Sequence, residues 1–351
     1  MEEGKIDYII YTNSGGDNGI TDYIKLHRRA LQLSVACLTS LDTANALADI
    51  IASNYNEGNT ELVDINNLRP EHQKLKFYKM QGSGNDYIFF DNFEGDITSP
   101  ESLCIRCVER NYSIGGDGIV LIEKSDIADA KMRVFNKDGS EGMMAGNCIR
   151  CVAKYLKDKG IVNKKDMTIE TASGVKEVKV YSFNGKVGSA QVNMGKPSFK
   201  PSDIPVNFSG DSVINKPVKI AGGEYNITCV SMGNPHCVVF CDRLATLDID
   251  HIGPQFENAE IFPERVNTEF VKVVDERTLI MRVWERGNGE TLACGTGACA
   301  AALAAIENGL CNKDEDITVR LTGGKVTVRY TGDTVYLTGN ANLIYEGVIE
   351  Y

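Results

Sequence analysis

The chain of 351 residues repeats itself at an offset of 149 positions, and this repeat is the sequence feature that most constrains its fold. The loop at 285–296 precedes a helix-like run of small residues, and the loop at 136–147 is also followed by a helical pattern. The register holds from Gly84 to Tyr181 in the first half. A register kept over this length leaves little room for insertions, so we expect two similar domains with the same order of elements.

The repeat fails at one position, where Cys294 in the second loop corresponds to Ala145 in the first. Two matching loops that each placed a reactive side chain at a helix start would describe an enzyme with two-fold pseudo-symmetric chemistry. Here one of the two thiols is replaced by a methyl group, which cannot carry a proton.

Length and charge limit the class of protein. The chain is long enough for two or three domains with substantial cores. A net charge of -11 and a pI near 5.0 argue against a nucleic-acid partner, for which a basic face is expected. No apolar run approaches the roughly 20 residues that span a bilayer, and the first residues lack the pattern of a signal peptide. We therefore expect a cytoplasmic protein without a membrane partner.

Residues 76–351 alternate short strand patterns with glycine turns and two helical stretches, which indicates an α+β fold class. We expect two similar pseudo-symmetric domains, 76–197 and 198–351, each a strand-rich sheet around a central helix, with the site in the cleft between them. The predicted strands are 77–80, 88–91, 118–123, 131–135, 167–171, 176–183, 189–194, 318–321, 325–330 and 334–338, and the predicted helices of the first half are 99–109 and 146–159.

Residues 1–75 lie outside the repeat and form an N-terminal α/β extension of unknown role. The pattern predicts a strand at 5–11 and a helical stretch at 21–54 that breaks near 40–43. Cys37 falls on an apolar stripe at helical spacing. Nothing in this segment has the pattern of a catalytic site.

Eleven cysteines in a chain of this length are better interpreted as reduced thiols than as a disulfide framework, because the count is odd. Cys104 with Cys107, and Cys148 with Cys151, have the spacing of zinc ligands. Both pairs fall in helical patterns and 40 residues separate them, so we expect no metal.

Cys294 is the strongest catalytic candidate. It precedes a Gly-Thr-Gly sequence and an alanine-rich helix, so its sulfur should face the free N–H groups and the positive dipole end of that helix. Such a position is expected to lower the pKa of the thiol toward neutrality and to supply a thiolate base. The alternative is a small packed residue, but the flanking glycines favour a ligand site.

Polar side chains recur at equivalent points of the two halves. Asn85 and Asn234 lie in Gly-Asn turns, which can be turn chemistry alone, but their equivalence favours function. Arg286 suits recognition of a carboxylate, since a guanidinium binds such groups in bidentate fashion. His236 is either a proton-handling neighbour or a structural histidine.

Six motifs in order give the chain a resemblance to the diaminopimelate epimerase family over residues 76–351. The resemblance implies a PLP-independent isomerase, without cofactor, that interconverts LL- and meso-diaminopimelate for lysine and peptidoglycan synthesis. In that family two cysteines face each other across the substrate, one thiolate removing the α-proton while the other thiol delivers one. Homodimers are common in it. The motifs are 80–86, 115–118, 135–141, 233–236, 265–269 and 285–300.

The resemblance also implies roles for single residues. Cys294 matches the second catalytic cysteine, Ala145 stands at the position of the first, and Glu285 and His236 match polar neighbours of the pair. The implied substrate-binding residues are Asn85, Asn136, Gly146, Asn147, Asn234, Asn267, Arg286, Gly295 and Thr296.

Ala145 makes us expect impaired epimerisation, because inversion requires proton transfer on both faces of the α-carbon. An engineered Cys-to-Ala change is the favoured explanation, followed by a natural pseudo-enzyme that only binds an amino acid. The third explanation is that Cys148 takes over the role of the missing cysteine. It ranks last because three residues of helix place Cys148 roughly 4.5 Å further along the helix axis. Another amino-acid racemase of the same fold is the alternative function, although Asn136, Asn267 and Arg286 favour a substrate with a distal carboxylate and amine.

Overall fold

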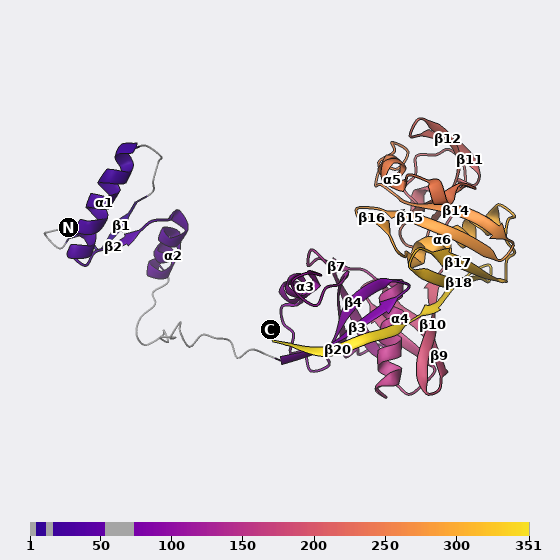
Figure 1. Cartoon of the computed structure of the whole chain (residues 1–351), viewed down its shortest axis with the longest axis horizontal. Helices are drawn as coiled ribbons and strands as arrows, with labels where there is room; N and C mark the ends of the chain where they lie inside the picture. Colours follow the sequence, from indigo (N-terminus) through magenta and orange to yellow (C-terminus); the bar gives the residue numbers. More distant parts are fainter. Residues whose placement is uncertain (1–4, 12–16, 53–73, 351) are drawn as a thin grey trace. The chain divides into compact units, whose positions relative to one another are not determined.

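The computed structural model describes residues 5–11, 17–52 and 74–350, which belong to two compact units, Met1–Glu71 and His72–Tyr351 (Figure 1). The first unit contains β1 (Tyr8–Ile10), α1 (Asp17–Gln32), β2 (Ala36–Leu38) and α2 (Leu41–Ala52), with β1 and β2 paired in parallel.

The helical stretch predicted at 21–54 is wrong in its middle. Helix α1 ends at Gln32, Ser34 adopts a positive φ of 56°, and the chain then enters β2. Cys37 therefore lies in a strand and not on a helical stripe. Its pairing with Ile9 is a long-range contact that helical spacing does not reveal.

The first half of the second unit follows the predicted order of strands and helices. Its elements are β3 (Lys74–Gly82), β4 (Asn85–Asp91), α3 (Pro100–Val108), β5 (Gly118–Glu123), β6 (Ala130–Asn136), β7 (Glu141–Gly142), α4 (Gly146–Asp158), β8 (Asp166–Thr171), β9 (Gly174–Phe183) and β10 (Lys186–Gly195).

The second half repeats this order after a short connection. Its elements are η1 (Pro201–Asp203), β11 (Lys216–Ile220), β12 (Gly223–Ser231), β13 (Pro235–Phe240), η2 (Leu244–Thr246), α5 (Ile249–Glu257), β14 (Asn267–Asp275), β15 (Thr278–Glu285), β16 (Gly289–Thr291), α6 (Gly295–Glu307), β17 (Asp316–Leu321), β18 (Gly324–Tyr330), β19 (Val335–Asn340) and β20 (Asn342–Glu350).

Strand pairing confirms that the halves share one α+β architecture. The parallel pair β4–β5 corresponds to β13–β14, and the parallel pair β6–β8 corresponds to β15–β17. Helices α4 and α6 each have 13 residues and begin at Gly146 and Gly295, which differ by the repeat offset of 149. The predicted two-domain pseudo-symmetric fold is therefore correct.

The halves exchange strands at their junction (Figure 1). β10 pairs antiparallel with β19, and the last strand, β20, returns to pair antiparallel with β3. The end of the chain thus completes the sheet of the first half.

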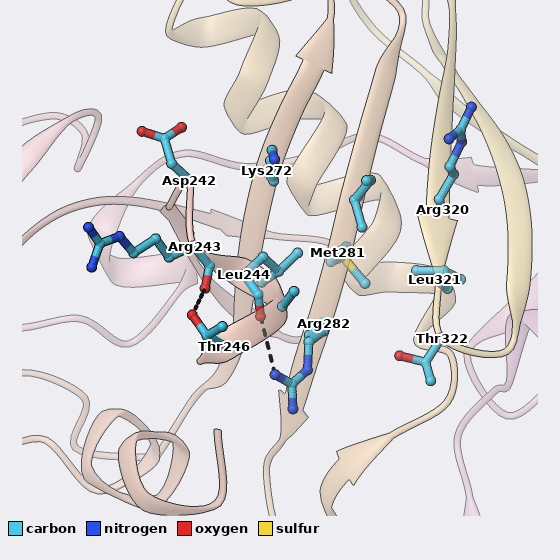
Figure 2. A pocket seen from close by; sticks show the side chains of 12 residues that line it. Asp242, Arg243, Leu244, Thr246, Lys272, Met281, Arg282, Arg320, Leu321 and Thr322 are labelled. Atoms are coloured by element: carbon cyan, nitrogen blue, oxygen red, sulfur yellow. Dashed lines mark hydrogen bonds between the residues drawn. The ribbon is translucent and has the colours of Figure 1, made fainter. Parts of the chain in front are cut away.

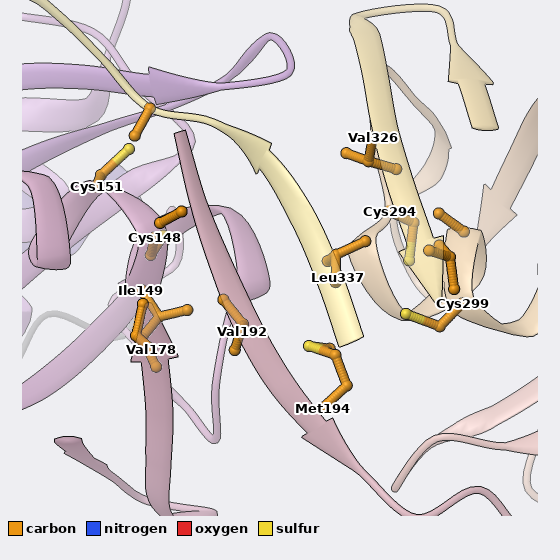
Figure 3. Close-up of a cluster of buried hydrophobic side chains, with 14 of the residues drawn as sticks. Cys148, Ile149, Cys151, Val178, Val192, Met194, Cys294, Cys299, Val326 and Leu337 are labelled. Carbon is orange, nitrogen blue, oxygen red and sulfur yellow. The ribbon is translucent and has the colours of Figure 1, made fainter. Parts of the chain in front are cut away.

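Helices α4 and α6 are the central helices of the two halves. Most of α6 is fully buried, and its alanines let the surrounding strands pack close to its backbone. Figure 3 shows Leu337 of β19 between the side chains of the α4 region and those of the α6 region, where one continuous apolar core joins the halves.

Candidate active site

The starts of α4 and α6 have the same backbone conformation and meet at the junction of the halves. The N-cap residue of α4, Ala145, has φ -130° and ψ 116°, while that of α6, Cys294, has φ -120° and ψ 115°. A Cβ atom placed on Gly295 would lie 3.9 Å from the Cα of Gly146. Two helix N-termini, each with free N–H groups, therefore converge on one place.

A cavity of about 1050 Å³ opens at this place. Its wall contains both N-cap residues and most of the residues predicted for the site. They are Asn85, Asn136, Ala145, Gly146, Asn147, Asn234, Glu285, Arg286, Cys294, Gly295 and Thr296.

Cys294 has only 7% of its surface exposed, and its sulfur accepts a hydrogen bond from the Gly297 amide at 3.3 Å. The hydroxyl of Thr296 lies 3.4 Å from the same sulfur. The prediction of a lowered pKa is wrong: burial, with the nearby carboxylates of Glu285 and Glu269, raises the pKa of the thiol. Desolvation of the thiolate exceeds the stabilisation by these hydrogen bonds.

Glu285 is the last residue of β15 and lies beside Cys294. Its carboxylate accepts a hydrogen bond from the Thr291 hydroxyl of β16 and is in hydrogen-bonding contact with the Cys294 thiol. Burial raises the pKa of Glu285. The contact puts this carboxyl group in position to take up or return the proton of the Cys294 thiol.

His236 is fully buried behind the cavity wall. Its Nδ1 lies 2.7 Å from Oε1 of Glu269, and its Nε2 lies 3.0 Å from Oδ1 of Asn234. The ring is therefore held between a carboxylate and a side-chain amide. Glu269 was missed as a functional residue, because only the parallel pairing of β13 with β14 brings it beside His236.

The asparagines at the cavity wall are oriented by neighbours from other elements. Asn234 donates to the Thr296 hydroxyl at 3.3 Å. Asn85 donates to the Asp117 carboxylate at 2.8 Å, and Asn147 of α4 donates to Oδ1 of Asn85 at 3.2 Å. These bonds fix which end of each amide faces the cavity.

Asn267 does not line the cavity. It is 5% exposed, donates to the carbonyl of Pro235 at 2.8 Å and accepts from the Arg286 amide at 2.9 Å. The Arg286 guanidinium bonds the carbonyl of Glu264 at 3.0 Å. Asn136, on the cavity wall, is exposed and donates to the Ser140 hydroxyl.

The starts of α4 and α6 also differ at the third helical position. The third helical position is Gly297 in α6 and Cys148 in α4. A Cβ on Gly297 would lie 3.3 Å from the sulfur of Cys294, because the N-cap side chain folds back over this position. By the same geometry in α4, the side chain of Cys148 is closer to the N-cap side chain than the rise along the helix axis suggests.

A second cavity, of about 650 Å³, lies elsewhere in the second half (Figure 2). It is bordered by η2, β14, β15 and the end of β17. Arg282 crosses its edge and donates to the carbonyls of Leu244 and Leu247 while pairing with Glu290. None of the predicted site residues lines it.

The chain matches the diaminopimelate epimerase family over residues 77–200 and 228–344. The diaminopimelate epimerase of Acetivibrio thermocellus is 45% identical over 278 residues, which are 79% of this chain and 99% of that protein. The diaminopimelate epimerase of Desulfovibrio desulfuricans is 47% identical over 281 residues, which are 78% and 97% of the two chains.

Solved structures share the fold at low sequence identity. A PhzF-family phenazine biosynthesis protein of Bacillus anthracis has a TM-score of 0.58 at 17% identity, over 80% of this chain and 100% of that chain. A hydroxyproline epimerase of Agrobacterium vitis has a TM-score of 0.54 at 14% identity, over 79% and 91%. Among the described residues, no helix is long and apolar enough to cross a membrane.

Proposed function

The chain belongs to the diaminopimelate epimerase family, and we propose that it binds diaminopimelate in the cavity between the starts of α4 and α6, with Cys294 at one face of the reacting α-carbon. The match to the family over both halves and the position of the two N-caps support this assignment.

The α-carboxylate of the substrate is expected at the two helix N-termini. The amides of Gly146, Asn147, Gly295 and Thr296 lie at these helix starts, where free N–H groups and the helix dipole favour an anion. Arg286 and Asn136, on the cavity wall, are available for the distal amino-acid group.

Proton abstraction at Cys294 requires that the thiol first loses its own proton, since burial keeps it protonated at neutral pH. The Glu285 carboxylate is in position to accept that proton. The thiolate then removes the α-proton, and the negative charge that develops on the substrate is stabilised by the helix N-termini. Inversion ends when a proton reaches the opposite face.

The N-cap residue of that opposite face carries no proton donor. The matched conformation of Ala145 and Cys294, one with a methyl group and one with a thiol, is the single observation that carries the proposal of impaired epimerisation. We therefore propose a protein that retains substrate binding and proton exchange on one face but has lost most of the two-face reaction.

The change Ala145→Cys tests this proposal. We expect it to raise epimerisation by at least about 10²-fold, the usual contribution of one acid–base group. The measurement is α-proton exchange in D₂O together with the ratio of LL- to meso-diaminopimelate, with Ala145→Ser as the matched control. A variant that folds and binds diaminopimelate but gains no epimerisation would contradict the proposal.

Cys148 defines a competing explanation, because its Cβ occupies a position close to the N-cap side chain. If Cys148 delivers the second proton, the unchanged chain epimerises and Cys148→Ala abolishes the activity. If neither the chain nor Ala145→Cys epimerises while both bind diaminopimelate by calorimetry, a non-catalytic amino-acid-binding protein is the better assignment. Recovery of epimerisation by Ala145→Cys is expected for an engineered trap and is not expected for a natural pseudo-enzyme.

We also propose a homodimer. The last strand, β20, carries exposed apolar side chains, with Ile344 exposed by 52% and Val348 by 61%. Apolar side chains gathered on one exposed strand are typical of an interface. Sedimentation of the full chain should give the mass of two copies, and Ile344→Asp should shift it toward one; a monomer at all concentrations would contradict the proposal.

A further inference from the structure

Arg150 is the largest fully buried side chain among the described residues, with 0% exposure. It lies in the second turn of α4, four residues after Gly146. Its guanidinium donates to the carbonyl of Gly146 at 3.0 Å, to Oδ1 of Asn147 at 2.7 Å and to the carbonyl of Asn340 at 3.2 Å.

These acceptors are all uncharged. No carboxylate in the described part of the chain forms an ion pair with Arg150, and the groups that act on it electrostatically are the thiols of Cys148, Cys151 and Cys299. Burial lowers the pKa of the guanidinium. A buried charge without a counter-charge is costly, and such charges are normally paired.

Two glycines leave the space that the Arg150 guanidinium occupies. A Cβ on Gly82 would lie 2.9 Å from the guanidinium nitrogen, and one on Gly339 would lie 2.9 Å from its central carbon. The equivalent position in α6 is Cys299, so the charge is present in only one half. Packing alone does not require it, since the second half packs the same helix without an arginine.

The uncompensated charge lies directly behind the proposed anion site. Arg150 bonds both residues that begin α4, Gly146 and Asn147, and Gly295 of the other helix start is adjacent to Gly146. Its positive charge therefore adds to the two helix dipoles at the point where they converge.

We infer that Arg150 is the buried counter-charge of the bound α-carboxylate, acting through Gly146 and Asn147 as a positioning residue that does not itself touch the ligand. This inference rests on the proposed function, because it requires an amino-acid carboxylate at the helix starts. The free protein carries the unpaired charge, and the anion neutralises it on binding.

The test is calorimetric titration of the full chain with diaminopimelate at pH 8, using Arg150→Gln and Arg150→Lys. Two charges several ångströms apart in a partly shielded interior correspond to roughly 10- to 100-fold in Kd. We expect Arg150→Gln to weaken binding by that factor. Arg150→Lys keeps the charge but not the three hydrogen bonds, and we expect it to stay within about tenfold of the unchanged chain.

A purely structural role predicts that the Lys and Gln variants weaken binding equally, and this result would overturn the inference, as would unchanged binding by Arg150→Gln. Asn147→Asp gives a second test that retains Arg150: it places a carboxylate against the guanidinium, and binding should weaken at least as much as in Arg150→Gln. Unaltered binding by Asn147→Asp would also refute it. If the unchanged chain does not bind diaminopimelate, the proposed function fails first.

Discussion

The sulfur of Cys294 accepts a hydrogen bond from the start of α6, an interaction that by itself favours a thiolate. Two carboxylates and full burial act in the opposite direction and raise the pKa of the thiol. A group held in this way reacts only when a bound ligand or a neighbouring base changes its surroundings. We therefore expect the reactivity of Cys294 to depend on whether a ligand occupies the cavity.

Glu285 gives a pH-dependent prediction. Burial raises its pKa above the ordinary value of 4.5, so its contribution to stability is complete at lower pH and is lost as the pH rises through the folded-state pKa. The change Glu285→Gln removes this penalty. We expect it to raise the free energy of unfolding by up to about 1 kcal/mol at pH 8 and by less at pH 4. Urea unfolding at the two pH values measures it, and an equal effect at both would contradict the prediction.

The residues of the site differ in how far the sequence alone predicts them. Cys294, Glu285 and Arg286 lie in one short segment of the sequence, so a short motif was enough to predict that they lie near one another. Arg150 and Glu269 were missed because their importance depends on partners distant in sequence, Asn340 for the first and His236 for the second. The resemblance implies that Asn267 binds the substrate. In the structure its side-chain oxygen accepts a hydrogen bond from the backbone amide of Arg286.

At the scale of elements, the starts of α4 and α6 differ in the residue at the third helical position and in the strand residue that packs behind it. In α6, Gly297 leaves room for the carboxylate of Glu269, from which a Cβ would be only 2.6 Å away. In α4 the equivalents are Cys148 and Val120. An apolar residue behind the helix permits a side chain at the third position, whereas a carboxylate requires glycine.

This exchange predicts that Gly297→Ala destabilises the protein by roughly 1–3 kcal/mol, a typical cost of overpacking. Glu269→Val should relieve the clash, so the double variant should be more stable than the sum of the two single effects predicts. Cys148→Ala is the matched control in α4, where no carboxylate opposes the side chain. Additive effects in denaturant unfolding would show that the two positions do not interact.

Strands and helices of the second unit were predictable because their apolar periodicity and glycine turns agree with the tertiary packing. The boundaries of α4, for instance, follow from Gly146 and the end of an apolar pattern. The short strand β2 was not predictable: three residues give no period, and the strand pairs in parallel with β1 across a helix. Pairing between distant segments is the part of the fold that local patterns do not encode.

At the scale of the whole molecule, every described residue that lines the cavity belongs to the His72–Tyr351 unit. Deletion of residues 1–71 should therefore leave the unfolding midpoint of this unit unchanged. The affinity for diaminopimelate should stay within about twofold of that of the full chain. Thermal unfolding and calorimetry are the measurements. Deletion through Met80 is the control, because it removes most of β3 and should abolish folding. A loss of binding in the shorter deletion would assign the first unit a part in the site.

The pairing of β20 with β3 has a consequence for the order in which the protein is made. A ribosome synthesises β3 first among the strands of the second unit and β20 last, and their register joins Lys74 to Glu350. Domains generally fold from the N-terminal side as they emerge during synthesis. Here the earlier half cannot close its sheet until β20 has been translated, so the half that is made first is completed only after the second half has been made.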